Sequence, residues 1–419
     1  MSYREEIAVD KGIDNTLSFL LEGYHYISNR TNKFGRNMFK TRLLGGKLFI
    51  CMVGEEAAEV FYDSHKFKRH GAAPKRVIQT LFGAEGVQTI DDNTHHHRKS
   101  LFMDMMDKKS LKKMNDIIKS EWIKALQNWE HQDEVVLYEE AKLVLTRSAC
   151  IWAGVPLLKS EEIKRTKELS ALFEAGGAIG ARHLRGRMDR DRVEKWAAEL
   201  ITSVREGTIN VDEDTPLYKI SFHKDLKDNY LDLHIASVEL INILRPIVAI
   251  SVYVVFCALG LKQFPEEQEK LYKADDRPYK NYVQEIRRYY PFFPMVIAQV
   301  KNDFLWKGHD FKKDTHVLLD LYGTNHHPDL WENPDHFQPQ RFSNWDESPF
   351  SFIPQGGGDY MSGHRCPGEW LTVNVMTTIL KLLVHHMSYD VPEQNLTYSF
   401  TKMPSLPKSK FIMKNIRHI

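Results

Sequence analysis

Apolar residues recur at three- and four-residue spacing through most of the middle of the chain, from about residue 95 to residue 286. This spacing gathers apolar side chains on one face of a helix, so the pattern predicts a mainly helical region. Helices are expected over 119–129, 142–152, 191–206 and 231–261. The last contains an apolar run over 246–261, which is shorter than the roughly 20 residues that a membrane span needs. A buried core helix is therefore expected there.

Short apolar runs with strand character lie on both sides of this helical region. Residues 47–53 read Lys-Leu-Phe-Ile-Cys-Met-Val and precede a predicted helix over 55–62. Further strands are expected at 315–319, 396–400 and 410–414, and one more helix over 368–386. Because no repeat or linker interrupts the pattern, we expect a single large domain over 1–419, mainly α with a minor β part.

The composition indicates which kinds of binding partner and which cellular compartment to expect. The 57 basic and 56 acidic residues leave a net charge of +1, which gives no electrostatic reason to expect nucleic acid. The four cysteines are scattered without a CxxC pair, and the N-terminal segment lacks the apolar core of a signal peptide. These features favour a soluble cytoplasmic protein without stable membrane insertion.

A glycine-rich stretch before the last predicted helix carries the most informative chemistry. Residues 356–369 read GGGDYMSGHRCPGE, so Cys366 precedes Pro367, a residue suited to the first helical position. N–H groups at a helix start would lower the pKa of the Cys366 thiol. A thiolate ligand pushes electron density onto haem iron and favours O–O cleavage. The alternative is a buried structural cysteine.

Two weaker motifs precede this loop. In Glu285-Ile-Arg-Arg288, Glu285 and Arg288 share one helix face and can pair. Such pairs are common on surfaces and contribute little there, so this motif alone has little weight. Downstream, Pro339-Gln-Arg-Phe342 supplies a second arginine, Arg341.

The ExxR, PxRF and Cys-Pro-Gly motifs occur in the order in which cytochromes P450 carry them, so the chain resembles that family over essentially its whole length. The resemblance implies the cytochrome P450 fold, with haem b (iron protoporphyrin IX) buried between long helices. It implies that Cys366 is the iron ligand. It also implies that Glu285, Arg288 and Arg341 form a triad that braces the haem-binding core.

The long helix departs from the usual family pattern. Oxygen-activating members carry an acid–alcohol pair at its centre, whereas this chain has Arg245-Pro246. Together with the glycine-rich loop and the segment Leu81-Phe-Gly-Ala-Glu-Gly-Val-Gln88, this resembles the bacterial fatty-acid peroxygenase and decarboxylase subfamily. Arg245, Pro246 and Gln88 are then the expected catalytic residues. Arginine suits a carboxylate because its guanidinium can bind both oxygens, although a salt bridge from Arg245 to Glu239 or another acid is the alternative.

Further cofactor and substrate residues are expected around this centre. His95 and Lys99 lie one helical turn apart, and the resemblance implies that they reach the haem propionates. His364 and Arg365 are expected to join them, with a solvated basic patch or a zinc site at 95–97 as alternatives. An apolar channel beside the haem is expected from Phe82, Leu172, Phe173, Phe292 and Val296, each of which has plain core packing as its alternative.

The resemblance implies an enzyme that uses hydrogen peroxide to oxidise the α or β carbon of a fatty acid. Arg245 would hold the carboxylate, which would replace the missing acid–alcohol pair as acid–base group. Because Gln88 stands where alkene-forming members carry histidine, 2- and 3-hydroxy acids are expected as main products with some 1-alkene. The alternatives are a predominant decarboxylase, a reductase-dependent monooxygenase and a haem sensor without turnover. Redox partners are expected to be optional at most.

Overall fold

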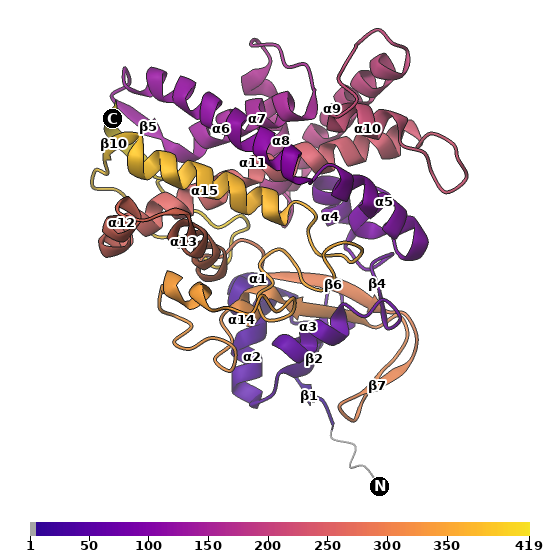
Figure 1. Cartoon of the computed structure of the whole chain (residues 1–419). Coiled ribbons are helices and arrows are strands. Elements are labelled where there is room, and N and C mark those ends of the chain that lie inside the picture. The colour runs from indigo at the N-terminus through magenta and orange to yellow at the C-terminus, as the bar shows by residue number, and fades with distance from the viewer. Residues whose placement is uncertain (1–5) are drawn as a thin grey trace.

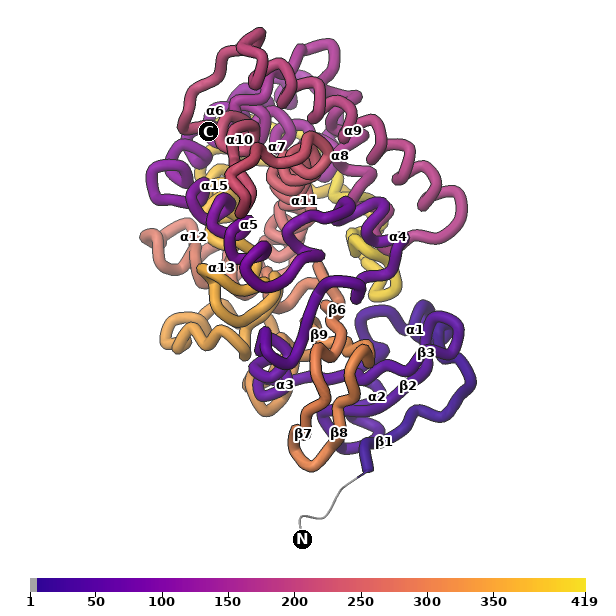
Figure 2. Tube along the Cα trace, turned by 90° about the vertical axis from the view of Figure 1, so that its right-hand side faces the viewer, coloured from indigo at the N-terminus to yellow at the C-terminus, as the bar shows by residue number. Residues whose placement is uncertain are grey.

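A larger helical part lies above a smaller part built around a sheet in the computed structural model, which describes residues 6–419 (Figures 1 and 2). The prediction of a mainly α protein with a minor β part is confirmed. The helices are α1 (Thr16–Glu22), α2 (Tyr26–Phe34), α3 (Glu55–Phe61), α4 (Lys75–Val77), α5 (Asp92–Asp104), α6 (Lys108–Trp129), α7 (Leu137–Ala153), α8 (Glu162–Glu174), α9 (Ala181–Arg205), α10 (Pro216–Phe222), α11 (Leu233–Gln263), α12 (Pro265–Tyr272), α13 (Asp276–Tyr289), α14 (Leu321–Asn325) and α15 (Glu369–His385).

The strands form one mixed sheet and two small ones. The main sheet has the order β1-β2-β3-β9-β6-β4, and the small sheets are β10-β11-β5 and β7-β8. The strands are β1 (Ala8–Val9), β2 (Met38–Leu43), β3 (Lys47–Met52), β4 (Phe67–Lys68), β5 (Glu134–Val136), β6 (Met295–Val300), β7 (Phe304–Trp306), β8 (His309–Phe311), β9 (His316–Asp320), β10 (Met387–Asp390) and β11 (Ile412–His418).

Strand β3 lies inside the main sheet, and this position explains why its sequence is apolar without alternation. It pairs with β2 in antiparallel register and with β9 in parallel register. Ile50 and Met52 pack into one core cluster, whereas Phe49 and Cys51 pack into another. Because successive side chains point to opposite faces, both faces of the sheet are buried here.

Helix α11 forms the axis of the helical part. Every residue from Ala236 to Leu261 is buried except Pro246, and α11 packs against α7, α8, α9 and α15. The helix is long and apolar enough to cross a membrane, yet 94% of its most apolar window is buried inside the protein. It therefore serves as a core helix, as the sequence predicts, and it continues through Pro246 without a break.

Two boundary predictions at the C-terminal end are wrong. Residues 396–400 form no strand, and single contacts hold this segment instead, such as the hydrogen bond from the Tyr24 N–H to the Phe400 carbonyl (2.8 Å). The last strand, β11, runs over Ile412–His418 rather than 410–414. It reaches further because it pairs with both β10 and β5.

Candidate active site

Cys366 lies in the loop that leads into α15. Its backbone N–H donates to the Gln355 carbonyl (3.2 Å), and the Gln355 side chain donates to its sulfur (3.7 Å). Gly368 is the N-cap of α15, and a Cβ added there would lie 4.0 Å from the sulfur. The helix begins only at Glu369, so Pro367 precedes the first helical turn rather than occupying it.

The expectation of a lowered thiol pKa is wrong for the protein without a bound metal. Burial raises the pKa of Cys366, and the negative charge of Glu369 adds to this effect. Lys99, the Gly368 N–H and Arg287 act in the opposite direction but do not outweigh burial. A bound metal ion would favour the thiolate here, since metal binding displaces the proton of a coordinating thiol.

The basic residues predicted beside the cofactor come together from α5 and the cysteine loop. His95 stacks on His364 with ring centroids 3.8 Å apart, and Lys99 donates to the Arg365 carbonyl. Burial lowers the pKa of His95 to about 2, that of His364 to about 4 and that of Lys99 to about 8. The sequence missed Arg69, which is buried and lies 4.3 Å from the Phe61 ring centroid. His95 and Lys99 are 3% and 1% exposed, so these two residues do not belong to a solvated patch. Among the described residues, no group of His, Cys, Asp or Glu side chains could hold a zinc ion.

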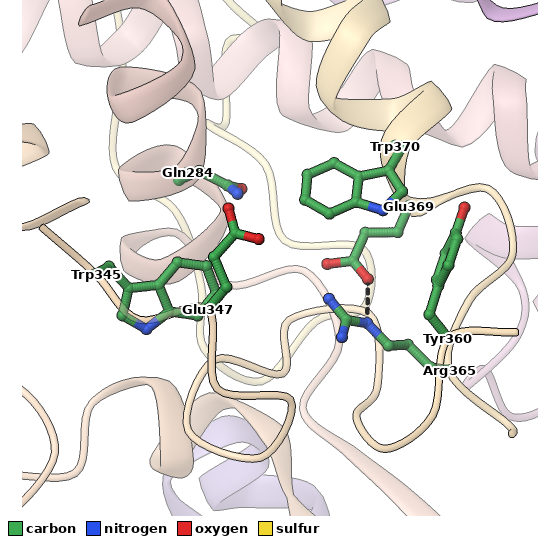
Figure 3. A pocket seen from close by; sticks show the side chains of 7 residues that line it. All are labelled: Gln284, Trp345, Glu347, Tyr360, Arg365, Glu369 and Trp370. Carbon is green, nitrogen blue, oxygen red and sulfur yellow. Dashed lines mark hydrogen bonds and ion pairs between the residues drawn. The ribbon is translucent and has the colours of Figure 1, made fainter. Parts of the chain in front are cut away.

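The guanidinium of Arg365, a predicted cofactor contact, pairs with a carboxylate at the start of α15. It donates to Glu369 (2.6 Å) in a cavity of about 90 Å³ beside the cysteine loop (Figure 3). Glu369 also accepts from the buried Arg287 (2.6 Å), which the sequence did not single out. Although burial opposes it, these two arginines lower the pKa of Glu369. This cavity is far smaller than a typical ligand pocket and is lined by both charged and aromatic side chains. The residues that line it are Gln284, Trp345, Glu347, Tyr360, Arg365, Glu369 and Trp370.

The opposite wall of the site comes from α11. In its buried core, Asn242, Arg245 and Ala249 keep 5%, 6% and 7% exposure, and Pro246 is half-buried. These positions follow the spacing i, i+3, i+4 and i+7, so they share one face. A single face that retains exposure inside the core lines an internal space.

Arg245 has no charged partner within residues 6–419. Its Nη2 donates to the Asn242 side chain (3.3 Å), and its buried Nε has no partner. Burial and the positive charge of Arg190 lower the pKa of Arg245 to about 9, while Cys366 acts to raise it. Arg245 therefore remains a buried cation at neutral pH, and such a group is costly unless an anion joins it.

The alternative of a salt bridge from Arg245 to Glu239 is wrong. Glu239 is fully buried and accepts from Arg98 (2.7 Å) and from the Val87 N–H (2.9 Å). It also accepts from the Asn242 amide, which in turn donates to Gln88 (3.2 Å). The sequence did not predict that Glu239 pairs with Arg98 and Asn242, since only folding brings α5 and the 87–89 turn against α11. Through Asn242, Gln88 and Arg245 belong to one hydrogen-bond network.

Arg190 is a second buried arginine that sequence reasoning missed. It extends from α9, donates to Glu194 (2.5 Å) and leaves its buried Nη2 without a partner among the described residues. A Cβ added at Gly83 would lie 2.1 Å from this Nη2, and Gly83 has a φ of +81°. Glycine is therefore required at this position for two reasons. Its backbone φ is positive, and the Arg190 guanidinium leaves no room for a Cβ.

The predicted channel residues divide between two core clusters. Leu172 and Phe173 of α8 are buried in the main cluster, and Phe82 and Phe292 pack against its edge. Val296 of β6 instead packs against the cluster beside the sheet. The first four therefore belong to the main core, and Val296 belongs to the core beside the sheet.

The predicted triad is closed, with Glu285 and Arg288 fully buried and Arg341 partly buried. Arg288 makes five hydrogen bonds, two to Glu285 (both 2.8 Å) and three to the carbonyls of residues 325, 334 and 336. Arg341 lies 3.2 Å from the Glu285 carboxylate. The triad ties α13 to the segment that leads into the cysteine loop.

These residues fit haem b. The site offers a soft sulfur ligand for iron at Cys366 and the buried cations Lys99 and Arg69 for propionate carboxylates. It also offers a narrow internal face of α11 with the small side chain Ala249. The fold and this donor set are those of a haem-thiolate protein.

Comparisons with known proteins agree with this class. The family model described as "Cytochrome P450" matches residues 273–415. Cytochrome P450 1A1 of Sparus aurata is 28% identical over 161 residues, which are 33% of this chain and 31% of that protein, so this match spans less than a third of the relative. Cytochrome P450 26A1 of Danio rerio is 22% identical over 90% of this chain and 83% of its own length.

Solved structures match over the whole chain. The structure of cytochrome P450EX alpha (CYP152N1) with myristic acid is 46% identical, with a TM-score of 0.96, and the match covers 99% of this chain and 100% of that one. A variant of cytochrome P450 OleT in complex with arachidonic acid is 37% identical, with a TM-score of 0.96 and 99% of both chains covered. The chain belongs to the cytochrome P450 family and is a haem oxidoreductase. Its solved relatives place it with the CYP152 members.

Proposed function

We propose that this protein is a peroxygenase that uses hydrogen peroxide to oxidise the α or β carbon of a fatty acid. The observation that carries the proposal is Arg245, a buried cation without a carboxylate partner in the described chain, on the α11 face that lines the internal space. The relatives solved with myristic and arachidonic acid support a fatty acid as the missing anion.

Each residue of the site has a distinct task in this proposal. Arg245 binds the substrate carboxylate, and Asn242 orients the Arg245 guanidinium. Arg98 neutralises Glu239, so that this carboxylate does not compete for Arg245. Cys366 would hold the haem iron, with His95, Lys99 and His364 near the propionates. The bound haem supplies the iron chemistry by which peroxide oxidises a C–H bond.

The substrate carboxylate is the acid–base group that moves the peroxide proton. The only acid of α11, Glu239, is held by Arg98 and two further donors, so it does not serve this purpose. For hydroxylation, the fatty acid and hydrogen peroxide give a hydroxy acid and water. For decarboxylation, they give a terminal alkene, carbon dioxide and two water molecules. We propose a single haem domain over 1–419 in the cytoplasm, with no obligate redox partner.

The test is turnover of myristate with hydrogen peroxide and no reductase, with products identified by mass spectrometry. Hydroxy acids or alkenes are expected from the wild type. A short carboxylic acid added with a substrate that lacks a carboxylate should restore oxidation, since the short acid would occupy Arg245. A protein that needs a reductase and NAD(P)H for any product would contradict the proposal.

A further inference from the structure

Segment 81–88 carries two of the predicted site residues, Phe82 and Gln88, and lies between α9 and α11. At its start, the helical turn Ile78–Phe82 packs against α9. At its end, Gln88 is hydrogen-bonded to the side chain of an α11 residue. Residues 83–86 between these two ends form no helix or strand. Contacts with the two neighbouring helices therefore decide where the segment lies.

Arg190 of α9 contacts the backbone on both sides of Phe82. On one side, its Nη1 donates to the Leu81 carbonyl (3.5 Å). On the other side, its guanidinium lies against Gly83, where an added Cβ would be 2.1 Å from Nη2 and 3.0 Å from Cζ. Arg190 is 2% exposed, and its Nε donates to Glu194 (2.5 Å), one turn further along α9. A buried guanidinium held by its own helix therefore connects α9 to the Phe82 backbone.

The Phe82 backbone also lies beside the residues that hold the substrate carboxylate in the proposed function. A Cβ added at Gly86 would lie 2.9 Å from the Phe82 carbonyl oxygen and 2.9 Å from Asn242 Nδ2. The oxygen of the same Asn242 amide accepts from Arg245 (3.3 Å). Phe82 is half-buried and packs against the main core. It therefore stands next to the Asn242–Arg245 pair, where the carboxyl end of the substrate would bind.

We propose that Arg190 is a positioning residue, which fixes Phe82 and thereby decides whether the α or the β carbon of the fatty acid is oxidised. The inference rests on the proposed function, because it explains the choice of carbon in that reaction. Arg245 fixes only the carboxylate, so the direction of the first carbons depends on the side chains beside them. A shift of about 1 Å in a bound substrate changes a rate by roughly 100-fold. A small movement of Phe82 is therefore enough to change which hydroxy acid is formed.

The shape of the Arg190 side chain matters in this role as well as its charge. The planar guanidinium has three nitrogens in a fixed fork, which here contact a carboxylate, a carbonyl and a glycine at the same time. A lysine would keep the positive charge but has a single ammonium nitrogen on a flexible stem. Arg190→Lys therefore separates the position of Phe82 from the positive charge near Arg245.

The first test is the ratio of 2- to 3-hydroxymyristate formed from myristate and hydrogen peroxide. Arg190→Lys and Arg190→Met should each change this ratio roughly threefold or more, because both release the Phe82 backbone. Arg190→Lys should keep the wild-type pH profile of fatty-acid affinity, because it keeps the charge. A wild-type ratio in both variants would overturn the proposal. A ratio that changes in Arg190→Met alone would assign the effect to charge, and the positioning role would be wrong.

The second test is hydrogen exchange in the haem-loaded full chain without substrate, which needs no turnover. The Gly83 N–H donates to the Ile78 carbonyl (2.8 Å) within the turn that Arg190 contacts. In Arg190→Met this amide should exchange faster than in wild type, because loss of the guanidinium allows the turn to open locally. Unchanged exchange would show that Arg190 does not hold the Phe82 backbone.

The matched control is Arg165→Met, which removes another buried arginine from the same pair of helices. Arg165 of α8 pairs with Glu161 (3.0 Å) and Glu168 (2.9 Å) and lies over the Trp196 ring of α9. This variant should lower stability but keep the wild-type product ratio and the wild-type exchange of Gly83. Equal changes in the control would show a general loosening of α8 and α9 and would overturn the proposal.

The two tests also separate this inference from the proposed function. Absence of any product from wild type with peroxide would contradict the proposed function. The exchange of the Gly83 amide would still decide whether Arg190 holds the Phe82 backbone, since that measurement needs no reaction.

Discussion

Arg288 and Arg245 are both buried on core helices, yet their surroundings are opposite. Arg288 makes five hydrogen bonds, and both oxygens of Glu285 are among its acceptors. Arg245 makes one hydrogen bond to a neutral amide and leaves its Nε unpaired. Glu239, the only acid of α11, is paired with Arg98 instead.

The difference separates a structural charge from a ligand-binding charge. A buried cation that the protein itself neutralises holds elements together, and its loss leaves an unpaired partner. A buried cation that the protein leaves without a counter-charge is available to an anion from outside. Both residues are buried arginines, so only their hydrogen-bond and charged partners distinguish them.

The largest effect is expected for Arg288→Met. This change leaves Glu285 as a buried carboxylate whose remaining partners are Arg341 and the Gln338 N–H (2.8 Å). Breaking a buried pair on one side costs about 3–5 kcal/mol of stability. We expect poor expression or an unfolding midpoint far below that of wild type, measured by urea denaturation. If Arg288→Met were as stable as wild type, the triad would not have the structural role given to it.

Arg245→Leu should leave stability unchanged or slightly increased, because it removes a buried charge that has no counter-charge. Fatty-acid turnover should fall roughly 30- to several thousand-fold, because about 2–5 kcal/mol of interaction with the carboxylate is lost. Haem absorbance checks the fold, and product formation from myristate with peroxide checks the function. Full turnover in this variant would contradict the carboxylate-anchoring role of Arg245.

Arg190→Met should have an intermediate effect, which is visible in the pH dependence of fatty-acid affinity. Arg245 binds a carboxylate while it is protonated, so affinity is complete below its pKa of about 9 and is lost as pH rises through it. The positive charge of Arg190 lowers the pKa of Arg245, so removing it should move this loss to higher pH. Fatty-acid affinity measured from the haem spectrum between pH 7 and 10 checks the shift. Arg192→Met, an exposed change on the same helix, is the control and should keep the wild-type profile.

The smallest effect is expected for Gln88→His, which should alter the product ratio more than the rate. Gln88 reaches Arg245 through Asn242. An amide cannot titrate near neutral pH, whereas an imidazole can exchange a proton there. Wild type should give mainly hydroxy acids, and the variant should give more alkene, as measured by gas chromatography. An unchanged ratio would show that Gln88 does not control the partition between hydroxy acid and alkene. A wild type that makes mainly alkene would reverse the product prediction.

The sequence predicted the elements that are long or strongly apolar. Helix α11 and strand β3 appear within a few residues of their predicted bounds, because most of α11 and residues 49–52 of β3 are buried on all sides and are therefore mostly apolar. The segment 396–400 was predicted wrongly, because a short apolar run does not specify whether a partner strand lies beside it. The triad Glu285–Arg288–Arg341 was predicted from a family motif rather than from spacing alone.

By itself, the sequence determined which side chains carry the chemistry: a cysteine after a glycine-rich loop, an arginine in an apolar helix and a helical ExxR pair. Only the tertiary structure decided which of these charges is neutralised. Arg98 comes from α5 and Glu239 from α11, and they are 141 residues apart in the chain. Arg190 reaches the same region from α9 and meets the backbone at Gly83. A counter-charge acts over a few ångströms, whatever the separation of the two residues along the chain. Whether Arg245 has a counter-charge is therefore decided only when these helices pack.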